Sequence, residues 1–191
     1  MQVEIRWEVE GNEEPIEVPW ENPARGTQYL DLRGEPAAIS QIEAARRQRP
    51  LQTFLTALNG ADSVFSTVRA SVWLAPETRA DAELSEFVSR VDLMFAAEEM
   101  NFDRGHYEGL VQRLVELLTR DAGDTLSVRL AVRRCFFRGT NRQGYALAMF
   151  LTARGETPGQ AELRWGLGLV RLQQALLFLS RVVRQHLAHS N

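Results

Sequence analysis

Residues 125–154 read TLSVRLAVRRCFFRGTNRQGYALAMFLTAR, and this stretch decides the fold. Apolar residues alternate with polar or small residues on both sides of a central connection, which is the period of a half-buried β-strand. The connection, residues 138–143, contains glycine and asparagine, which favour tight hairpin turns. The stretch therefore predicts two antiparallel strands, at 125–137 and 144–154.

The segment before this hairpin has the same order of elements. Residues 64–74 and 87–96 alternate with period two and predict a second pair of strands. Apolar residues at helical spacing follow from about Asp103 to Leu118. Residues 63–189 thus predict strand, strand, helix, strand, strand, helix, which indicates a structural repeat of two ββα units.

The last predicted helix begins at Thr157 and runs to about His189. Thr157 suits the N-cap, Pro158 the first helical position, and Gln160 completes a capping box. One stripe of this helix is expected to face the core: Trp165, Leu169, Leu172, Leu176, Leu179, Val183 and Leu187. Further apolar residues, Leu167, Val170, Leu177 and Phe178, fall on other sides of the helix.

This second apolar surface needs a cover. The cover is either the N-terminal segment of the same chain or a second copy, and we favour a homodimer because symmetric dimers are the commonest soluble assembly.

The N-terminal residues predict a β-hairpin over residues 2–20. Apolar and charged residues alternate from 3 to 9, Gly11-Asn12 offers a turn, and the alternation resumes at 16–20. Two prolines place the second strand at an edge, because proline lacks the N–H that a ladder needs. Short helices are expected at 36–48 and from Pro50 to Asn59.

The predicted fold class is therefore α+β. An antiparallel sheet from two ββα units packs against long helices, with an N-terminal β-hairpin and short helices added. Residues 1–35 are expected to form a hairpin and linker arm, and residues 36–191 a single domain. The order of helix, two strands, helix, two strands, helix resembles, in topology, that of small dimeric α+β folds such as the type III secretion chaperones.

Composition excludes several classes of protein. The 191 residues include 22 arginines and no lysine, with 45% hydrophobic residues, which excludes a disordered or collagen-like chain. The absence of lysine excludes Schiff-base chemistry and a P-loop lysine. No stretch of eighteen residues lacks charge, and the N-terminus has no apolar run, so neither a transmembrane helix nor a secretory signal is expected. We expect a cytoplasmic location.

Charge is unevenly distributed along the chain. The net charge is −6 over residues 1–24, −4 over 25–119 and +7 over 120–191. Such asymmetry indicates either an anionic partner for the basic end or an acidic N-terminal segment that lies on the basic half. A sequence pI of about 5.7 and the lack of a nucleic-acid motif argue against nucleic acid as that partner.

The predicted strands place a row of arginines on one face of the sheet. If all strands join one sheet, its second face bears Arg69, Trp73, Arg90, Arg129 and Arg133. Such a face would bind an anion, a nucleotide or a single strand through arginine contacts and stacking. Alternatively, it is a solvated face with cross-strand ion pairs, or the acidic N-terminal segment covers it.

Acid–base candidates gather before the first long helix, at Glu98, Glu99, Asp103 and His106. Glu98 and Glu99 are adjacent, so a turn would be needed to make their carboxylates converge. Two histidines, His186 and His189, have helical spacing but no third metal ligand nearby, and neither a metal nor a cofactor is expected. Neighbouring arginines would lower the pKa of the Cys135 thiol, although a lone cysteine beside two phenylalanines is more often a small apolar residue.

These features favour a non-enzymatic, homodimeric protein that binds another protein or a peptide. The competing hypothesis is an anion-binding module, or an enzyme that uses the row of arginines together with the acid–base candidates.

Overall fold

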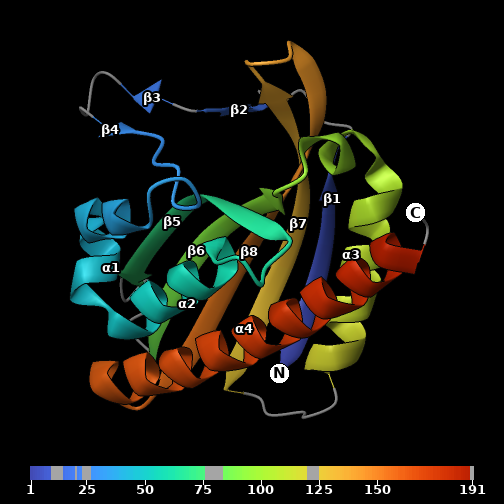
Figure 1. Ribbon diagram of the computed structural model, residues 1–191. Coiled ribbons are helices and arrows are strands. Elements are labelled where there is room, and N and C mark those ends of the chain that lie inside the picture. The colour runs from blue at the N-terminus through green and yellow to red at the C-terminus, as the bar shows by residue number, and fades with distance from the viewer. Residues whose placement is uncertain (10–14, 20, 23–26, 76–83, 120–124, 190–191) are drawn as a thin grey trace.

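The central element is a six-stranded sheet with the order β1-β7-β8-β6-β5, in which β2 also pairs with β7 (Figure 1). The computed structural model describes residues 1–9, 15–19, 21–22, 27–75, 84–119 and 125–189. The sheet strands are β1 (Gln2–Glu8), β2 (Ile16–Val18), β5 (Phe65–Leu74), β6 (Ser85–Phe95), β7 (Leu126–Phe137) and β8 (Arg142–Gly155). The short strands β3 (Glu21–Asn22) and β4 (Thr27–Gln28) pair with each other.

The remaining elements are helical. In the described ranges, 3₁₀ helices occur at Pro36–Gln41 and Glu98–Phe102. The α-helices are α1 (Glu43–Arg47), α2 (Arg49–Asn59), α3 (Arg104–Leu118) and α4 (Pro158–His189). The fold is therefore a mixed α+β fold with a mostly antiparallel sheet, as the sequence predicts.

The predicted N-terminal hairpin is wrong. Both β1 and β2 pair with β7, and both pairings are parallel. The partners of β1 are residues 127–133 of β7 and those of β2 are residues 135–137, so the two strands follow each other along one edge of β7. Alternation of apolar and charged residues indicates a half-buried strand, but it does not identify the partner strand.

The helices cover one face of the sheet and enclose the main core. Trp165 of α4 is fully buried, and its Nε1 donates a hydrogen bond to Ser89 Oγ on β6 at 2.8 Å. The Trp165 ring also contacts the ring of Phe87, with 5.0 Å between the centroids. Helices α2, α3 and α4 lie in front of the strands in Figure 1, and their buried residues belong to one cluster with those strands.

The predicted helix over residues 36–48 is divided in two. A 3₁₀ helix ends at Gln41, Ile42 is extended, and α1 begins at Glu43. Helix α2 contains Pro50 in its first turn and ends before Gly60, as expected from the turn residues there.

Helix α4 begins with one half of the predicted capping box, because the Gln160 side chain binds the N–H of Glu156 rather than that of Thr157. The Gln160 N–H donates to Thr157 Oγ1 at 3.2 Å, and Gln160 Oε1 accepts from the Glu156 N–H at 2.7 Å. Between Pro158 and Gln185 this helix is long and apolar enough to cross a membrane, and core helices of soluble proteins share both properties. Here one side of the helix packs on the sheet.

Candidate functional site

The face of the sheet that turns away from the helices carries the arginines singled out in the sequence. Phe150 of β8 is in register with Arg90 on one side and with Arg129 on the other, and Arg69 is in register with Asp92. Residues in register point to the same side of a sheet, so these side chains share one face. This Arg-lined face consists of Arg69 and Trp73 on β5, Arg90 on β6, and Arg129 and Arg133 on β7.

Asp92 is the buried acid of the Arg-lined face. Its side chain is fully buried and accepts two hydrogen bonds from Arg90, one from Nε at 2.7 Å and one from Nη2 at 2.8 Å. Arg69 lies on the next strand, where burial lowers the pKa of its guanidinium while the charge of Asp92 acts in the opposite direction. The carboxylate therefore neutralises part of the positive charge on this face.

The Phe150 ring lies between two of the arginines. The guanidinium carbon of Arg129 is 4.1 Å from the ring centroid, and that of Arg90 is 5.2 Å from it. Both distances are in the range of cation–π contacts. Arg129 Nε is buried and has no hydrogen-bond acceptor among the described residues.

The acidic N-terminal strand supplies further charge to the same face. Arg133 forms an ion pair with Glu8 of β1 at 3.0 Å, and Glu4 of β1 is in register with Arg129. Directly after β7, Arg138 pairs with Glu17 of β2. Acidic residues of the N-terminal segment thus lie on the basic β7–β8 hairpin within one chain, which is one of the two arrangements expected from the charge asymmetry.

Trp73 lies apart from the centre of this face. It is in register with Val88 near the end of β5, and β6 and β8 separate it from Arg129 and Arg133. Its side chain is 39% exposed. The structure therefore brings the arginines near one another but does not add Trp73 as a stacking platform beside them.

The four acid–base candidates connect the start of α3 to the β7–β8 hairpin. Each of the four side chains is exposed and has a partner. Glu98 accepts a hydrogen bond from Thr140 Oγ1 at 2.7 Å, and Glu99 forms an ion pair with Arg142 at 3.1 Å. Asp103 accepts from the Gly105 N–H at 2.8 Å, and His106 Nδ1 lies 2.9 Å from Met100 O. Asp103 is the N-cap residue of α3. All four side chains thus make contacts that stabilise the corner between the 3₁₀ helix 98–102 and α3.

Cys135 is fully buried, and burial raises the pKa of its thiol to about 12. The neighbouring arginines therefore do not activate it, because the cost of burying a thiolate is the larger effect. It packs in a small apolar cluster with Ile16 and Val18 of β2. The side chains of His186 and His189 lie outside the described residues, and no group of three potential metal ligands occurs in the described part of the chain.

The outer side of α4 bears a stripe of exposed apolar residues that is interrupted by the exposed Gln174. Its members are Leu163, Leu167, Val170 and Phe178, which are 68%, 59%, 48% and 47% exposed. Leu167, Val170 and Phe178 were expected on this side from the sequence, whereas Leu177 is only half-exposed. Leu163 was not expected there, although its spacing of four residues from Leu167 carries the signal.

A surface cavity lies on each side of the α4 stripe. Between α2 and α4 a cavity of about 550 Å³ is lined by Pro50, Gly166 and Leu167, among others. Between α3 and α4 a smaller one, of about 250 Å³, is lined by Leu117 and Phe178. The stripe is therefore the ridge of a surface with two depressions.

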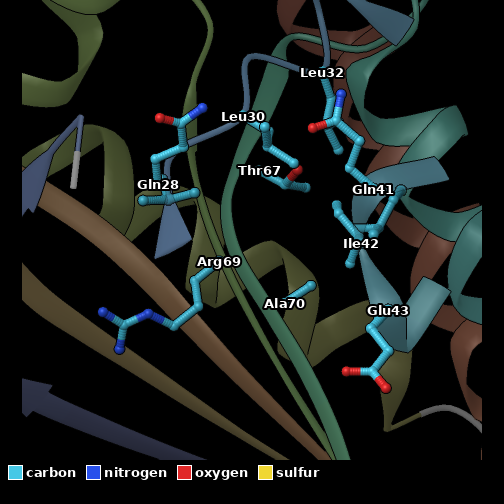
Figure 2. Close-up of a pocket in the computed structure, with 11 residues that line it drawn as sticks. Gln28, Leu30, Leu32, Gln41, Ile42, Glu43, Thr67, Arg69 and Ala70 are labelled. Carbon is cyan, nitrogen blue, oxygen red and sulfur yellow. The ribbon is translucent and has the colours of Figure 1, made fainter. Parts of the chain in front are cut away.

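A larger groove lies along β5, which is at the other end of the sheet from β1 (Figure 2). Its volume is about 580 Å³. Gln28 and Arg69 lie on one side of the strand in Figure 2, and Gln41, Ile42 and Glu43 lie on the other. Sequence reasoning missed this groove because only the strand order identifies β5 as an edge strand.

Comparisons of the chain with protein-family models, with curated protein sequences and with solved structures gave no match.

Proposed function

We propose that the protein is a cytoplasmic, homodimeric protein-binding protein without catalytic activity, in which two copies meet along the α4 stripe. One observation carries the proposal: four large apolar side chains are exposed on one side of a helix whose opposite side is already buried in the core, with Gln174 between Val170 and Phe178. Exposed apolar side chains gathered on one side of a helix are typical of interaction sites.

The α4 stripe suits a second copy of the same chain. In an antiparallel pair of helices, a two-fold axis between Val170 and Arg171 places Leu163 of each copy beside Phe178 of the other. Both ends of the stripe are then covered by the same contact made twice, as an isologous interface requires. The adjacent depressions beside the stripe receive the flanking side chains.

The absence of catalysis is part of the proposal because the acid–base candidates already have partners. Glu99 is paired with Arg142, and Asp103 caps α3. A catalytic group needs to reach a substrate atom within hydrogen-bonding distance. These side chains instead lie on the exposed corner between the 3₁₀ helix 98–102 and α3.

Light scattering after size-exclusion chromatography tests the dimer. The expected mass is twice the chain mass of 21.6 kDa. The substitution Leu167→Glu places a charge in the middle of the interface and is expected to give the monomer. The control Ile5→Glu changes another exposed apolar residue, on β1, and is expected to leave the dimer intact; Ile5 is 42% exposed and Leu167 is 59% exposed. A wild-type mass near 21.6 kDa would refute the proposal.

A second candidate function is anion binding on the Arg-lined face, and the buried Nε of Arg129 favours it. An N–H buried without an acceptor is a place where a carboxylate or phosphate oxygen would be stabilised. A thermal-shift titration with inorganic phosphate and with citrate tests this function. The expected rise in melting temperature is absent in Arg129→Gln, and no rise in the wild type would exclude the function.

A further inference from the structure

Strand β5 is at one end of the sheet. Among the described residues it pairs only with β6, so one row of its backbone groups points out of the sheet. The Ala75 N–H donates to Glu86 O, and the Ala96 N–H donates to Val64 O. Along an antiparallel strand, the backbone N–H and C=O groups of alternate residues point toward the partner strand and away from it. The register shifts between Thr67 and Arg69, so the alternation restarts there. The residues whose groups point away from β6 are therefore 65 and 67 before the shift and 70, 72 and 74 after it.

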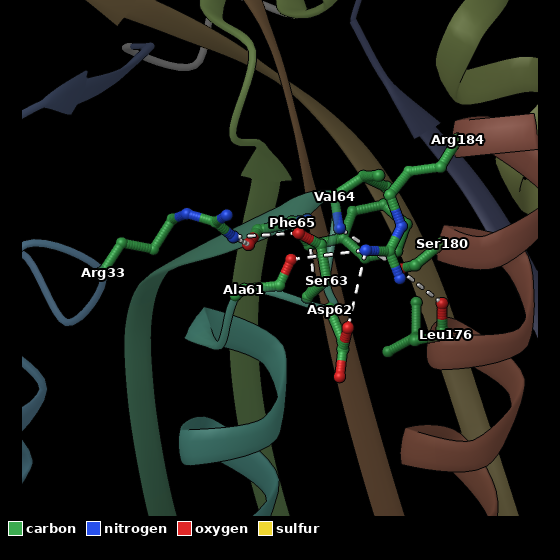
Figure 3. A network of polar contacts seen from close by, with 9 residues as sticks. All are labelled: Arg33, Ala61, Asp62, Ser63, Val64, Phe65, Leu176, Ser180 and Arg184. Atoms are coloured by element: carbon green, nitrogen blue, oxygen red, sulfur yellow. Dashed lines mark hydrogen bonds and ion pairs between the residues drawn. The ribbon is translucent and has the colours of Figure 1, made fainter. Parts of the chain in front are cut away.

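The first part of this edge is closed by side chains. Arg33 Nη1 donates to Ser63 O at 3.0 Å and to Phe65 O at 2.9 Å, as Figure 3 shows. The Thr67 N–H donates to Asn59 Oδ1 at 3.0 Å. In Figure 3, Arg184 of α4 also contacts the turn that leads into β5, through Ala61 O and Asp62. These contacts hold the beginning of β5, and with Ser63 Oγ they satisfy both outward groups of Phe65 and the outward N–H of Thr67.

The second part of the edge is open. Within the described ranges, no hydrogen bond reaches the outward N–H and C=O groups of Ala70 and Val72. Residues 70–75 read ASVWLA and contain no charge and no proline. Natural sheets usually protect an edge strand with charges, prolines or a cover. An unprotected edge in a folded protein is a site for strand pairing.

The groove in Figure 2 runs along residues 67–70 of β5 and reaches the open part of the edge at Ala70. On the helix side of β5 it is lined by Ile42 and Leu55 together with Gln41 and Glu43. On the other side are Gln28 and the half-buried Arg69. The carboxylate of Glu43, also in the groove, is paired with Arg47 at 2.6 Å. One side of the groove therefore presents two apolar side chains beside an ion-paired carboxylate, and the other presents an arginine.

We propose that an extended segment of a partner protein adds to the sheet as a strand along Ala70 and Val72 of β5. Successive side chains of a strand point to opposite faces. The bound segment therefore alternates apolar residues, which lie toward Ile42 and Leu55, with acidic residues, which lie toward Arg69. The inference rests on the proposed protein-binding function and names the kind of segment that is bound.

A single strand fits this edge better than a second copy of the whole chain. Gln28 lines the groove on one side of β5, and residues 41–43 line it on the other. An extended peptide needs room for a single strand between these walls. A second β5 would bring its own copies of both walls to the same place.

Fluorescence anisotropy with short synthetic peptides tests the proposal. A labelled peptide of alternating valine and glutamate is expected to bind. The same peptide with N-methyl groups on alternate backbone nitrogens, placed to block the ladder, is expected to bind at least about tenfold more weakly, because it loses hydrogen bonds to β5. Equal binding of the methylated peptide, or no binding of the unmodified peptide, would overturn strand addition. Equal binding of an alternating valine–lysine peptide would overturn the assignment of acidic residues.

A pair of variants at Ala70 provides the matched control. Ala70→Pro removes an outward N–H and leaves the hydrogen bonds to β6 in place, since proline is tolerated at sheet edges. It is expected to weaken peptide binding about tenfold, whereas Ala70→Ser is expected to retain it. Equal binding by the two variants would contradict the proposal. Both are expected to have the mass of the wild-type protein in light scattering, so a failed dimer prediction and a failed peptide prediction are distinguishable.

Discussion

Asp92 and Arg90, two residues apart on β6, form a bidentate ion pair in which the carboxylate is shielded from solvent. The carboxylate is fully buried, whereas the arginine side chain is 17% exposed. The two N–H groups that meet the carboxylate have the fork geometry that guanidinium groups favour with carboxylates. The pair therefore holds charge inside an otherwise open face of the sheet.

Loss of Asp92 is expected to be costly. Asp92→Ala leaves Arg90 without its acid in a half-buried position, and breaking such a pair is expected to lower the free energy of unfolding by about 3 kcal/mol. Urea denaturation measures this change. Adding Arg90→Ala to the Asp92→Ala variant is expected to cost little more, because the unpaired charge is removed. Strictly additive effects of the two substitutions would show that the residues do not interact.

The strand pattern could be predicted from the sequence, but the partners of the first strand could not. Residues 65–74 and 126–137 lie within a residue of the predicted strands, because alternation reports directly on burial. The alternation in β1 is equally clear. Its partner is β7 rather than β2, and this depends on which strand has a free edge after the sheet has formed.

For the Arg-lined face, too, the sequence predicts the position of the residues but not their contacts. Period two is enough to place Arg90 and Arg129 on the face away from the core. The contacts of these side chains with Phe150, and the pairing of Arg133 with Glu8, depend on the strand order β1-β7-β8-β6. A single sequence does not contain that order in its local pattern.

In α4, helical spacing predicts the buried stripe well. Trp165, Leu169 and Leu172 are each at most 1% exposed. Leu177 was assigned to the outer surface but is only half-exposed, because in helical rotation it lies nearer the buried stripe than Leu163 does. The limits of an exposed apolar stripe therefore depend on the neighbouring helices, which the pattern of one helix does not describe.

Cys135 is expected to be unreactive in the folded protein. Its pKa of about 12 means that few thiolates form at pH 8, and the side chain is fully buried. A chromogenic disulfide reagent at pH 8 is expected to modify the thiol only after the chain is unfolded in guanidinium chloride. Rapid modification of the native protein would contradict the burial of this residue.

The same thiol makes stability depend on pH in the alkaline range. Its pKa in the unfolded chain is about 8.5. A group with a raised pKa in the folded state stabilises the fold below its unfolded pKa, and this stabilisation is lost as the pH rises toward 12. The free energy of unfolding is therefore expected to fall more steeply above pH 9 in the wild type than in Cys135→Ala. Parallel pH profiles for the two proteins would refute this prediction.

The hydroxyl of Tyr107 is expected to stabilise the junction between α3 and the sheet. It lies 2.7 Å from Asn101 Oδ1 and 2.8 Å from Tyr145 O, and the Tyr107 side chain is fully buried. Tyr107→Phe is expected to lower the free energy of unfolding by about 1 to 2 kcal/mol, because buried acceptors lose their donor. Tyr145→Phe is the control, with an expected change within about 0.5 kcal/mol, since only its backbone takes part in this network. Urea denaturation that gave equal losses for both variants would rule out the special role of the Tyr107 hydroxyl.

Gly155 and Gly159 flank the start of α4 and are expected to respond oppositely to alanine. A Cβ at Gly155 would lie 2.5 Å from the backbone nitrogen of Ala161, so the strand end or the helix must move. Gly155→Ala is therefore expected to destabilise the protein by about 1 to 3 kcal/mol. A Cβ at Gly159 meets nothing within 4 Å, and alanine has the higher helix propensity, so Gly159→Ala is expected to stabilise by about 0.5 to 1 kcal/mol. Thermal unfolding of the two variants measures both changes in stability. A Gly155→Ala protein as stable as the wild type would mean that α4 does not approach the end of β8 as closely as this geometry requires.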